Sequence, residues 1–260
     1  MLNITVKKSK IASVDKALSI LNLFKNNEEL SLTEISKKLN FPKTTCFGLI
    51  ATLEAQEYLK QDDVSGKYSL AYSIVELFNA FNNRLNIRQE AIIHLKYLAD
   101  KYQKNAHLTV LDGIDVVYLE SVTYYGELMV KTVVGSRAPA NCTSTGKAFL
   151  ASMTDEELDQ ILSKYPLRGL TEYSKKEINI LKEELTIIRK VGYSIDNQES
   201  LLGVKGVGVI VKNNLSKPLL GLSLSGLAAY LTDDIIKECV LDLNKVAGEL
   251  SKLVGNKLSI

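Results

Sequence analysis

The sequence predicts an α+β fold, in which a mainly helical N-terminal part precedes an antiparallel sheet of about six strands packed with helices. Two observations predict it. Up to about residue 104, apolar residues mostly recur at helical spacing, and from His107 onward several segments show the period of two that is typical of strands. Strand-like and helix-like segments in the second part do not alternate one for one, which argues against a doubly wound sheet. A chain of 260 residues is long enough for two domains with separate cores.

The composition excludes several classes of protein. Formal net charge is only +2, and the first 70 residues hold ten lysines, no arginine and eight acidic residues. Contact with nucleic-acid phosphates would therefore depend on where lysines stand rather than on bulk charge. The three cysteines are too far apart in sequence to suggest a zinc site or a disulfide framework, and we expect neither metal nor cofactor. No signal peptide and no apolar run of about 18 residues is evident, so we expect a cytoplasmic protein without membrane contact.

The first predicted helix follows a solvated lysine-bearing tail, residues 1–12. Ser13 is expected to cap it. Its inward stripe consists of Val14, Ala17, Leu18, Leu21 and Phe24.

Two short helices are predicted between residues 31 and 53, with a tight break at residues 40–42. Ser31 and Glu34 have the spacing of a capping box, and Pro42 suits the first position of the second helix. The second helix turns Cys46, Leu49, Ile50 and Leu53 inward and leaves Lys43, Thr44, Phe47, Gly48 and Ala51 outside. This arrangement is typical of a helix-turn-helix, which places its second helix in the DNA major groove. A small helical hairpin without DNA contact would show the same pattern.

Two short strands, residues 57–60 and 66–70, are predicted to form a wing around a turn-rich loop, with Lys67 placed to reach phosphate. With these strands, residues 11 to 70 resemble the winged-helix domain of IclR-type bacterial transcription regulators, most clearly in SLTEISKKLNFPKTT and the following IATLE. The resemblance implies a winged helix-turn-helix domain at residues 11–72 that binds double-stranded operator DNA. Its expected DNA-binding residues are Ser31, Thr33, Lys43, Thr44, Thr45, Phe47, Gly48 and Lys67.

A linker helix is predicted at residues 71–84. Its stripe of Ile74, Leu77, Phe78 and Phe81 needs a partner, for which a second copy of the chain is the simplest choice, in a dimer or a tetramer. The alternative is that the helix folds back on its own domain. A longer helix, residues 87–104, follows with Ile92, Leu95, Leu98, Ala99 and Tyr102 inward.

The remaining elements are predicted in the order hairpin, strand, helices, strands and helix. HLTVL and IDVVYLESV form the hairpin around Asp112-Gly113, and LMVKTVVG (residues 128–135) is a third strand. Helices follow at residues 145–152 and 154–164, and Ser174 with Glu177 is expected to open another. The last three strands are GYSIDN, VGVIVKN and LLGLSLSG, and Thr232 caps a final helix ending near Gly255.

Residues 71 to 256 resemble the effector-binding domain of the same family, whose fold is GAF-like, in GSRAPANCTSTGKAFLA, GYSIDNQESLLGVKGVGVIV and GLSLSG. The resemblance implies a linker helix and effector-binding domain at residues 73–256. It places the effector, which we expect to be a hydroxylated or keto acid, against Ser144, Thr145, Asp196, Gly206, Ser223 and Ser225, with Val130, Ala138 and Val204 as the apolar wall. The alternation of Ser223 and Ser225 with leucines independently puts both hydroxyls on one face of a strand.

Four positions depart from the family pattern. Relatives commonly carry His at the position of Asn141 and often carry Cys at the position of Gly206. The absence of a thiol at Gly206 enlarges the expected cavity. Phe47-Gly48 replaces a common His-Arg pair, so bidentate reading of guanine is lost there. Phe47 is instead suited to contact thymine methyl groups, and Gly48 permits close approach of the helix.

An enzyme is poorly supported. Two histidines, both in predicted core-facing elements, leave no base near a nucleophile in sequence. Thr145-Gly146-Lys147 lacks the flanking residues of a phosphate-binding loop. We therefore predict a ligand-responsive DNA-binding transcription regulator that controls genes of organic-acid or sugar-derivative metabolism. The alternatives are a GAF-fold enzyme with a vestigial DNA-binding domain, dependent on Cys142, and a protein-interaction module.

Overall fold

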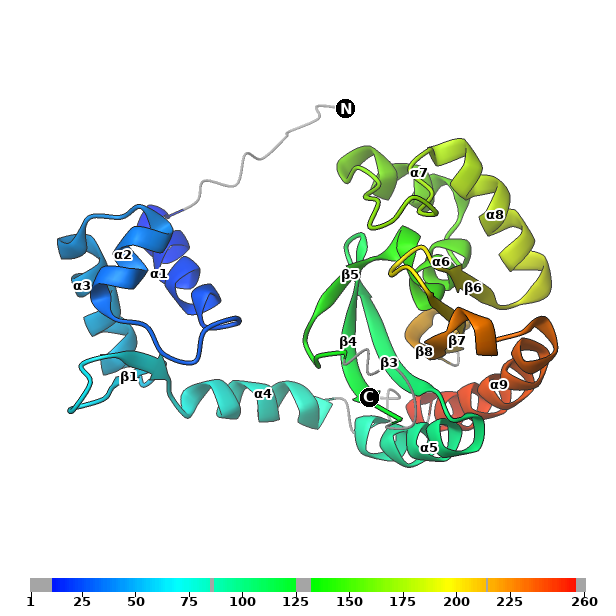
Figure 1. Cartoon of the computed structure of the whole chain (residues 1–260), viewed down its shortest axis with the longest axis horizontal. Coiled ribbons are helices and arrows are strands. Elements are labelled where there is room, and N and C mark those ends of the chain that lie inside the picture. The colour runs from blue at the N-terminus through cyan, green and yellow to red at the C-terminus, as the bar shows by residue number, and fades with distance from the viewer. Residues whose placement is uncertain (1–10, 85–86, 125–131, 214, 256–260) are drawn as a thin grey trace. The chain divides into compact units, whose positions relative to one another are not determined.

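In the computed structural model, which describes residues 11–84, 87–124, 132–213 and 215–255, contacts divide the chain into two units, Met1–Leu85 and Asn86–Ile260 (Figure 1). Each unit has its own hydrophobic cluster. Within the described ranges, no helix is both long enough and apolar enough to cross a membrane.

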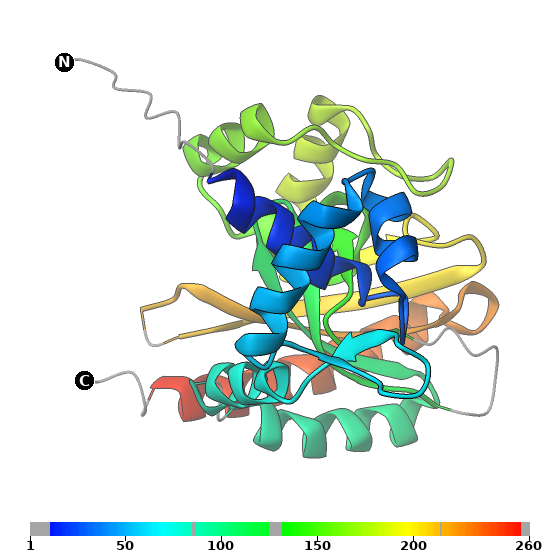
Figure 2. The ribbon, with the colours of Figure 1, turned by 90° about the vertical axis from the view of Figure 1, so that its left-hand side faces the viewer.

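The first unit is a winged helix-turn-helix, as predicted. It comprises α1 (Ala12–Leu23), α2 (Leu32–Leu39), α3 (Lys43–Ala55), β1 (Leu59–Gln61), β2 (Tyr68–Leu70) and the linker helix α4 (Ser73–Arg84). Figure 2 shows the first three helices, in blue, beside the cyan hairpin. Strands β1 and β2 pair antiparallel. The core joins all three helices and the wing through Ile20, Ile35, Cys46, Ile50, Leu53 and Leu59.

The break between α2 and α3 follows from local chemistry. The backbone N–H of Ser31 donates to Glu34 Oε2 at 2.8 Å, and Ser31 Oγ accepts from the Glu34 N–H at 3.3 Å, which confirms the capping box. Asn40 ends α2 in the left-handed region with φ of 52°, a conformation that asparagine tolerates. Pro42 is the N-cap of α3 and not its first residue, so α3 begins one residue later than expected.

Three further local predictions in this unit are wrong. Helix α1 begins at Ala12 behind Ile11, without a side-chain cap, so Ser13 does not cap it. Val14 and Leu18 are more than half exposed, whereas Ile20 is fully buried, because the inward face of α1 is set by its contact with the other helices. Strand β1 begins at Leu59, since Glu57 has a φ of 58° and turns the chain out of α3.

The second unit contains a six-stranded antiparallel sheet, as predicted, in the order β5-β4-β3-β8-β7-β6. The strands are β3 (Asn105–Asp112), β4 (Asp115–Val122), β5 (Arg137–Pro139), β6 (Ser194–Asn197), β7 (Val204–Lys212) and β8 (Pro218–Leu227). The predicted third strand is misplaced: residues 128–131 lie outside the described residues, residues 132–136 carry no strand, and β5 pairs with β4 instead.

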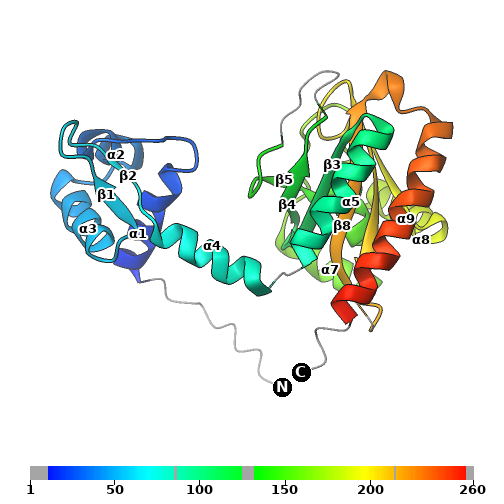
Figure 3. The ribbon, with the colours of Figure 1, turned by 90° about the horizontal axis from the view of Figure 1, so that it is seen from below.

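Helices cover the sheet on both faces. Helices α5 (Ile87–Tyr102) and α9 (Asp233–Gly255) lie side by side on one face (Figure 3). On the other face, α6 (Ser144–Ala151) packs on the sheet, and α7 (Asp155–Lys164) and α8 (Ile178–Val191) share its core. Short 3-10 helices, η1 (Ala140–Cys142) and η2 (Ala228–Tyr230), precede α6 and α9.

Local chemistry explains where these helices start. Thr154 and Glu157 form the predicted capping box of α7. Ser174 does not open α8, because its hydroxyl is bonded to the backbone of Thr171 and of Glu199; α8 starts at Ile178 behind Glu177, without a side-chain cap. A Cβ on Gly208 would lie 2.9 Å from the N atom of Thr145, so this glycine allows the start of α6 to approach β7.

Candidate DNA-contact surface and ligand pocket

The outward face of α3 is exposed, as its sequence predicts. Lys43, Thr44, Phe47, Gly48 and Ala51 all lie in solvent, and 59 % of the Phe47 surface is exposed. A Cβ added at Gly48 would meet no atom within 4 Å. A single exposed apolar side chain is normal on a protein surface, so this face is open to a partner but does not by itself identify one.

The first turn of α3 is suited to an anion. Helix N-termini present backbone N–H groups without intrahelical partners and carry a partial positive charge. In α3 no side chain caps this end and no acidic residue lies in the first turn, which contains Lys43, Thr44 and the half-buried Thr45. A phosphate group at this end would receive both backbone donors and the Lys43 charge.

The other predicted DNA contacts are less exposed. Ser31 and Thr33 are half-buried at the start of α2, and the Ser31 hydroxyl is engaged in its capping box. Lys67 lies at the loop end of the wing, where its carbonyl accepts from the Asp62 N–H, and its Nζ is 3.9 Å from Glu29 Oε2. A weak, exposed ion pair of this kind leaves the ammonium able to exchange its partner for phosphate.

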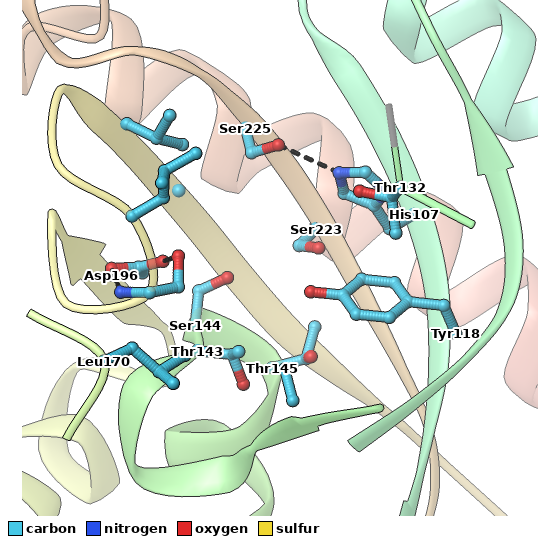
Figure 4. A pocket seen from close by; sticks show the side chains of 15 residues that line it. His107, Tyr118, Thr132, Thr143, Ser144, Thr145, Leu170, Asp196, Ser223 and Ser225 are labelled. Carbon is cyan, nitrogen blue, oxygen red and sulfur yellow. Dashed lines mark hydrogen bonds between the residues drawn. The ribbon is translucent and has the colours of Figure 1, made fainter. Parts of the chain in front are cut away.

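The second unit contains a cavity of about 190 Å³ on the face of the sheet that carries α6. Eight of the nine predicted effector-binding residues line it: Ala138, Ser144, Thr145, Asp196, Val204, Gly206, Ser223 and Ser225. The ninth, Val130, lies outside the described residues. Figure 4 shows the labelled polar side chains converging on the cavity from separate elements. Its volume is below the roughly 300–1,000 Å³ of pockets that enclose drug-sized molecules, so a ligand here must be a small metabolite.

The start of α6 forms one wall. Thr143 is its N-cap, and its hydroxyl accepts from the Gly146 N–H at 3.1 Å. Ser144 and Thr145 follow, and the Thr145 hydroxyl accepts from Thr109 at 2.9 Å. The pocket therefore meets the positive end of a helix, which favours an anionic group.

Asp196 lines the cavity beside Ser144, with only 5 % of its surface exposed. It accepts from the N–H of Glu199 at 2.8 Å, from the N–H of Ser200 at 3.2 Å, and from the Ser200 hydroxyl. Burial raises the pKa of Asp196 to about 6, although these hydrogen bonds oppose the shift. Its carboxyl group is thus poised to accept from a ligand hydroxyl and takes up a proton close to neutral pH.

His107 lines the pocket, although the sequence predicted only a core-facing histidine there. Its Nδ1 lies 3.0 Å from Ser121 Oγ and its Nε2 lies 2.9 Å from Ser225 Oγ, the bond drawn in Figure 4. Burial lowers the pKa of His107 to about 4, so the ring is neutral at pH 7. The ring also meets Tyr118 edge to face at 5.4 Å between centroids.

Six further lining residues were not predicted: Tyr118, Thr132, Thr143, Leu170, Ser200 and Leu201. His107 enters the site because β3 pairs with β8, where it lies opposite Ser223 and shares its face, and this pairing between distant segments has no local sequence signal. Leu170 and Thr132 lie in irregular segments, where the sequence has no periodicity that predicts the direction of a side chain.

The chemistry of the pocket is that of hydrogen bonding. Hydroxyls of Ser144, Ser223 and Tyr118 face the cavity, and no lysine or arginine is among the described lining residues. Gly206 adds room, since a Cβ there would lie 3.4 Å from Ser144 Oγ. Asn141 does not line the pocket; its Nδ2 donates to the carbonyls of Arg168 and Lys175 at 2.7 and 3.0 Å.

Neither metal chemistry nor a thiol nucleophile is indicated by the described residues. They contain no group of three or more His, Cys, Asp or Glu that would hold a metal ion. Cys142 is fully buried, donates to the Arg168 carbonyl at 3.2 Å, and has its pKa raised by burial. A buried thiol of raised pKa is inert.

Comparisons with known proteins agree for both units. The family described as "IclR helix-turn-helix domain" matches residues 13–63, and "Bacterial transcriptional regulator IclR C-terminal" matches residues 80–252. The transcriptional regulator XynR of Escherichia coli K12 is 32 % identical over 246 residues, which are 94 % of this chain and 98 % of that protein.

Solved structures give the same result. The IclR of Thermotoga maritima superposes with a TM-score of 0.77 at 29 % identity, covering 95 % of this chain and all of that one. An IclR homologue of Microbacterium hydrocarbonoxydans, crystallised with 4-hydroxybenzoate, has the same fold with a TM-score of 0.81 at 19 % identity, covering 92 % of this chain and 98 % of that one.

Proposed function

The chain belongs to the IclR family of bacterial transcription regulators, and we propose that it binds a palindromic operator as a homo-oligomer and releases or re-engages it when a small acid occupies the pocket. In this proposal residues 11–72 form the DNA-binding domain, and residues 73–256 form the linker helix and the effector-binding domain. Its place of action is the cytoplasm, where operator DNA is found.

The exposed face of α3 supports the DNA-binding part. Lys43 and Thr44 engage phosphate at the helix N-terminus, while Phe47 and Gly48 lie further along the helix, where the floor of the major groove would be. A phenyl ring offers apolar contact to the C5-methyl group of thymine and no hydrogen bond to guanine. We therefore propose a thymine-containing step in each half-site opposite Phe47.

The pocket supports the choice of effector. A carboxylate fits the start of α6 at Ser144 and Thr145, and a hydroxyl or keto oxygen fits the hydroxyls of Ser223 and Ser225 or the carboxyl of Asp196. Because Asp196 is acidic and no cation lines the described pocket, a dianion would be repelled. The effector class is thus a small hydroxylated or keto monoacid. The 4-hydroxybenzoate bound by the Microbacterium homologue belongs to this class and is one compound to test.

Helix α4 supports self-association. Leu77 and Phe78, neighbours in the predicted stripe, are 56 % and 43 % exposed on this helix, and the side chain of Phe81 lies outside the described residues. A partner copy would cover these apolar groups and place two recognition helices on one operator. Leu77→Asp should give smaller species in sedimentation and weaker operator binding with an unchanged far-UV spectrum, whereas unchanged assembly would mean that α4 packs within its own subunit.

One experiment tests the whole proposal. Genomic fragments retained by the purified protein are sequenced, and their retention is measured again with pyruvate, lactate, gluconate and 4-hydroxybenzoate. An inverted repeat with half-sites about one helical turn or a multiple apart, whose occupancy changes with one of these acids, is the expected result. Retention of no fragment, or turnover of an acid by the protein, would refute it.

A further inference from the structure

Four charged side chains lie behind the pocket without lining it. Lys147 Nζ is 2.5 Å from Glu184 Oε1 and 2.5 Å from Glu199 Oε2. Lys175 Nζ contacts Glu199 Oε1 and lies 3.4 Å from Glu184 Oε2. We call these four residues the charge ring. The side chain of Lys147 is fully buried and that of Glu199 is 1 % exposed, while the two positive and two negative charges balance.

The members of the charge ring come from segments that also supply pocket walls. Lys147 is on α6, one turn after Ser144 and on the same helix as Thr145. Glu199 immediately precedes Ser200 and Leu201, which line the cavity. Each wall is therefore attached to a charged group that is buried away from the ligand.

Hydrogen bonds extend the charge ring into the site. The N–H of Glu199 donates to Asp196 Oδ1 at 2.8 Å, and its carbonyl accepts from the Ser174 hydroxyl at 2.7 Å. The Ser174 hydroxyl also accepts from the N–H of Leu170, a third wall of the cavity, at 3.0 Å. A displacement of Glu199 would consequently move the donors of Asp196 and release Leu170.

Building on the proposed effector site, we propose that the charge ring sets the separation of the three pocket walls, with Lys147 and Glu199 as positioning residues. Charges removed from water are stable only when they are paired, so each ammonium group fixes the distance between the carboxylates on either side of it. An apolar cluster of the same volume would fill the space but would not impose those distances. None of the four side chains has to touch the effector.

The test removes one positive and one negative charge together. Lys147→Met with Glu199→Gln keeps the volume and the net charge, and leaves Lys175 and Glu184 to pair with each other. The matched control is Arg88→Met with Glu120→Gln, which removes the half-buried 2.8 Å ion pair between α5 and β4. Glu199→Asp, which keeps the charge and shortens its reach by one methylene group, replaces the double variant if that does not fold.

Hydrogen exchange at neutral pH gives the first readout, which needs no ligand. We expect amides of residues 143–147, 169–175 and 196–203 to exchange at least tenfold faster in the charge-ring variant, but not in the control, while the amides of β3 and β8 stay protected. Unchanged exchange, or an even rise through the second unit, would overturn the proposal, because the ring would then contribute only general stability.

The second readout is affinity for whichever of the four acids binds the parent protein most tightly. It should fall at least tenfold in the charge-ring variant and less than twofold in the control, with operator binding in the absence of acid unchanged. Parent-like affinity in a variant with loosened walls overturns the positioning role. If none of the four acids binds the parent, the proposed effector class fails, whereas the exchange measurement still decides the role of the charge ring.

Discussion

The outward face of α3 and the pocket of the second unit are both polar sites, but they are built in opposite ways. The α3 face is formed by successive turns of one helix, and its side chains are exposed to solvent. The pocket gathers buried polar groups from strands, a helix start and irregular segments, and its groups are bonded to each other. Removal of an exposed side chain from α3 should therefore change mainly binding, whereas substitutions in the pocket should change binding and folding together.

The largest expected difference between the two sites is in pH dependence. The folded pKa of Asp196 is about 6 against an ordinary value of 3.8, so its contribution to stability is present below pH 3.8 and is lost as pH rises through 6. The folded pKa of His107 is about 4 against 6.5, so its contribution is present above pH 6.5 and is lost as pH falls through 4. Between pH 4 and 6 these two slopes cancel.

Removal of either group should leave the pH dependence of the other uncancelled. In Asp196→Asn, the free energy of unfolding should fall on acidification from pH 6.5 to 4 by up to about 3 kcal/mol more than in the parent, and His107→Gln should show the opposite sign. Urea titrations followed by circular dichroism measure this. Lys43→Ala on α3 should show the same dependence of unfolding free energy on pH as the parent. If the Asp196 and His107 variants also showed the parent's pH dependence, the shifted pKa values of these two buried groups would be contradicted.

Ligand-induced stability is the next largest effect. An effector at about one hundred times its dissociation constant should stabilise the parent by roughly 2.7 kcal/mol. This gain should vanish in Ser223→Ala with Ser225→Ala, because each lost donor leaves a ligand oxygen unsatisfied at about 1–3 kcal/mol. Thermal unfolding with and without the acid measures it, and Ser163→Ala on the exposed side of α7 is the control. A double variant that still binds operator and responds as the parent does would place the effector site elsewhere.

The same substitution should have opposite effects in the two units. A Cβ on Gly146 in α6 would lie 2.3 Å from the carbonyl oxygen of Ala140, so Gly146→Ala forces a backbone shift and should destabilise the second unit by about 1–3 kcal/mol. Gly48→Ala on α3 meets nothing and should stabilise its helix by about 0.5–1 kcal/mol. Urea unfolding of both variants measures the contrast.

Operator affinity sharpens the glycine comparison further. Gly48→Ala should weaken operator binding despite its greater stability if the α3 backbone approaches the DNA closely at this position. Equal affinity would show that this turn of α3 does not contact the groove.

The smallest expected effect is that of Lys43→Ala. Removing one phosphate contact should lower the slope of log affinity against log salt concentration by about one and leave sequence preference unchanged. Titrations of operator DNA at several salt concentrations measure the slope, with Lys25→Ala, outside α3 and the wing, as the control. An unchanged slope would remove Lys43 from the DNA contact.

The two sites also differ in how far the sequence predicts them. Local patterns suffice for α3, since Cys46 and Ile50 turn inward, Phe47 turns outward, and the Ser31 capping box fixes the start of the preceding helix. Where the inward face depends on tertiary contact, as for Val14 in α1, the pattern failed.

For the pocket, only the shared face of Ser223 and Ser225 follows from local sequence. The other predicted residues were identified by resemblance to a family, and His107 and the six further lining residues were not predicted. Asp196 and Ser144 are 52 positions apart, and β5 and β6 are opposite edges of the sheet. Nothing local tells that a histidine in β3, His107, will be bonded to Ser225 of β8. Strand order and register decide this, and they depend on pairings between distant segments.

The strand order has a consequence for synthesis of the protein. Strand β8 lies between β3 and β7, so among the described strands the two halves of the sheet are paired only through residues 218–227. The winged helix-turn-helix is complete once β2 has been made. At roughly 5–20 residues per second, a ribosome needs roughly another 8–30 s to reach the end of β8. A nascent chain thus has a complete winged helix-turn-helix domain well before the sheet of its effector-binding domain can form. A truncated product that ends before β8 would keep the first domain without a folded effector-binding domain.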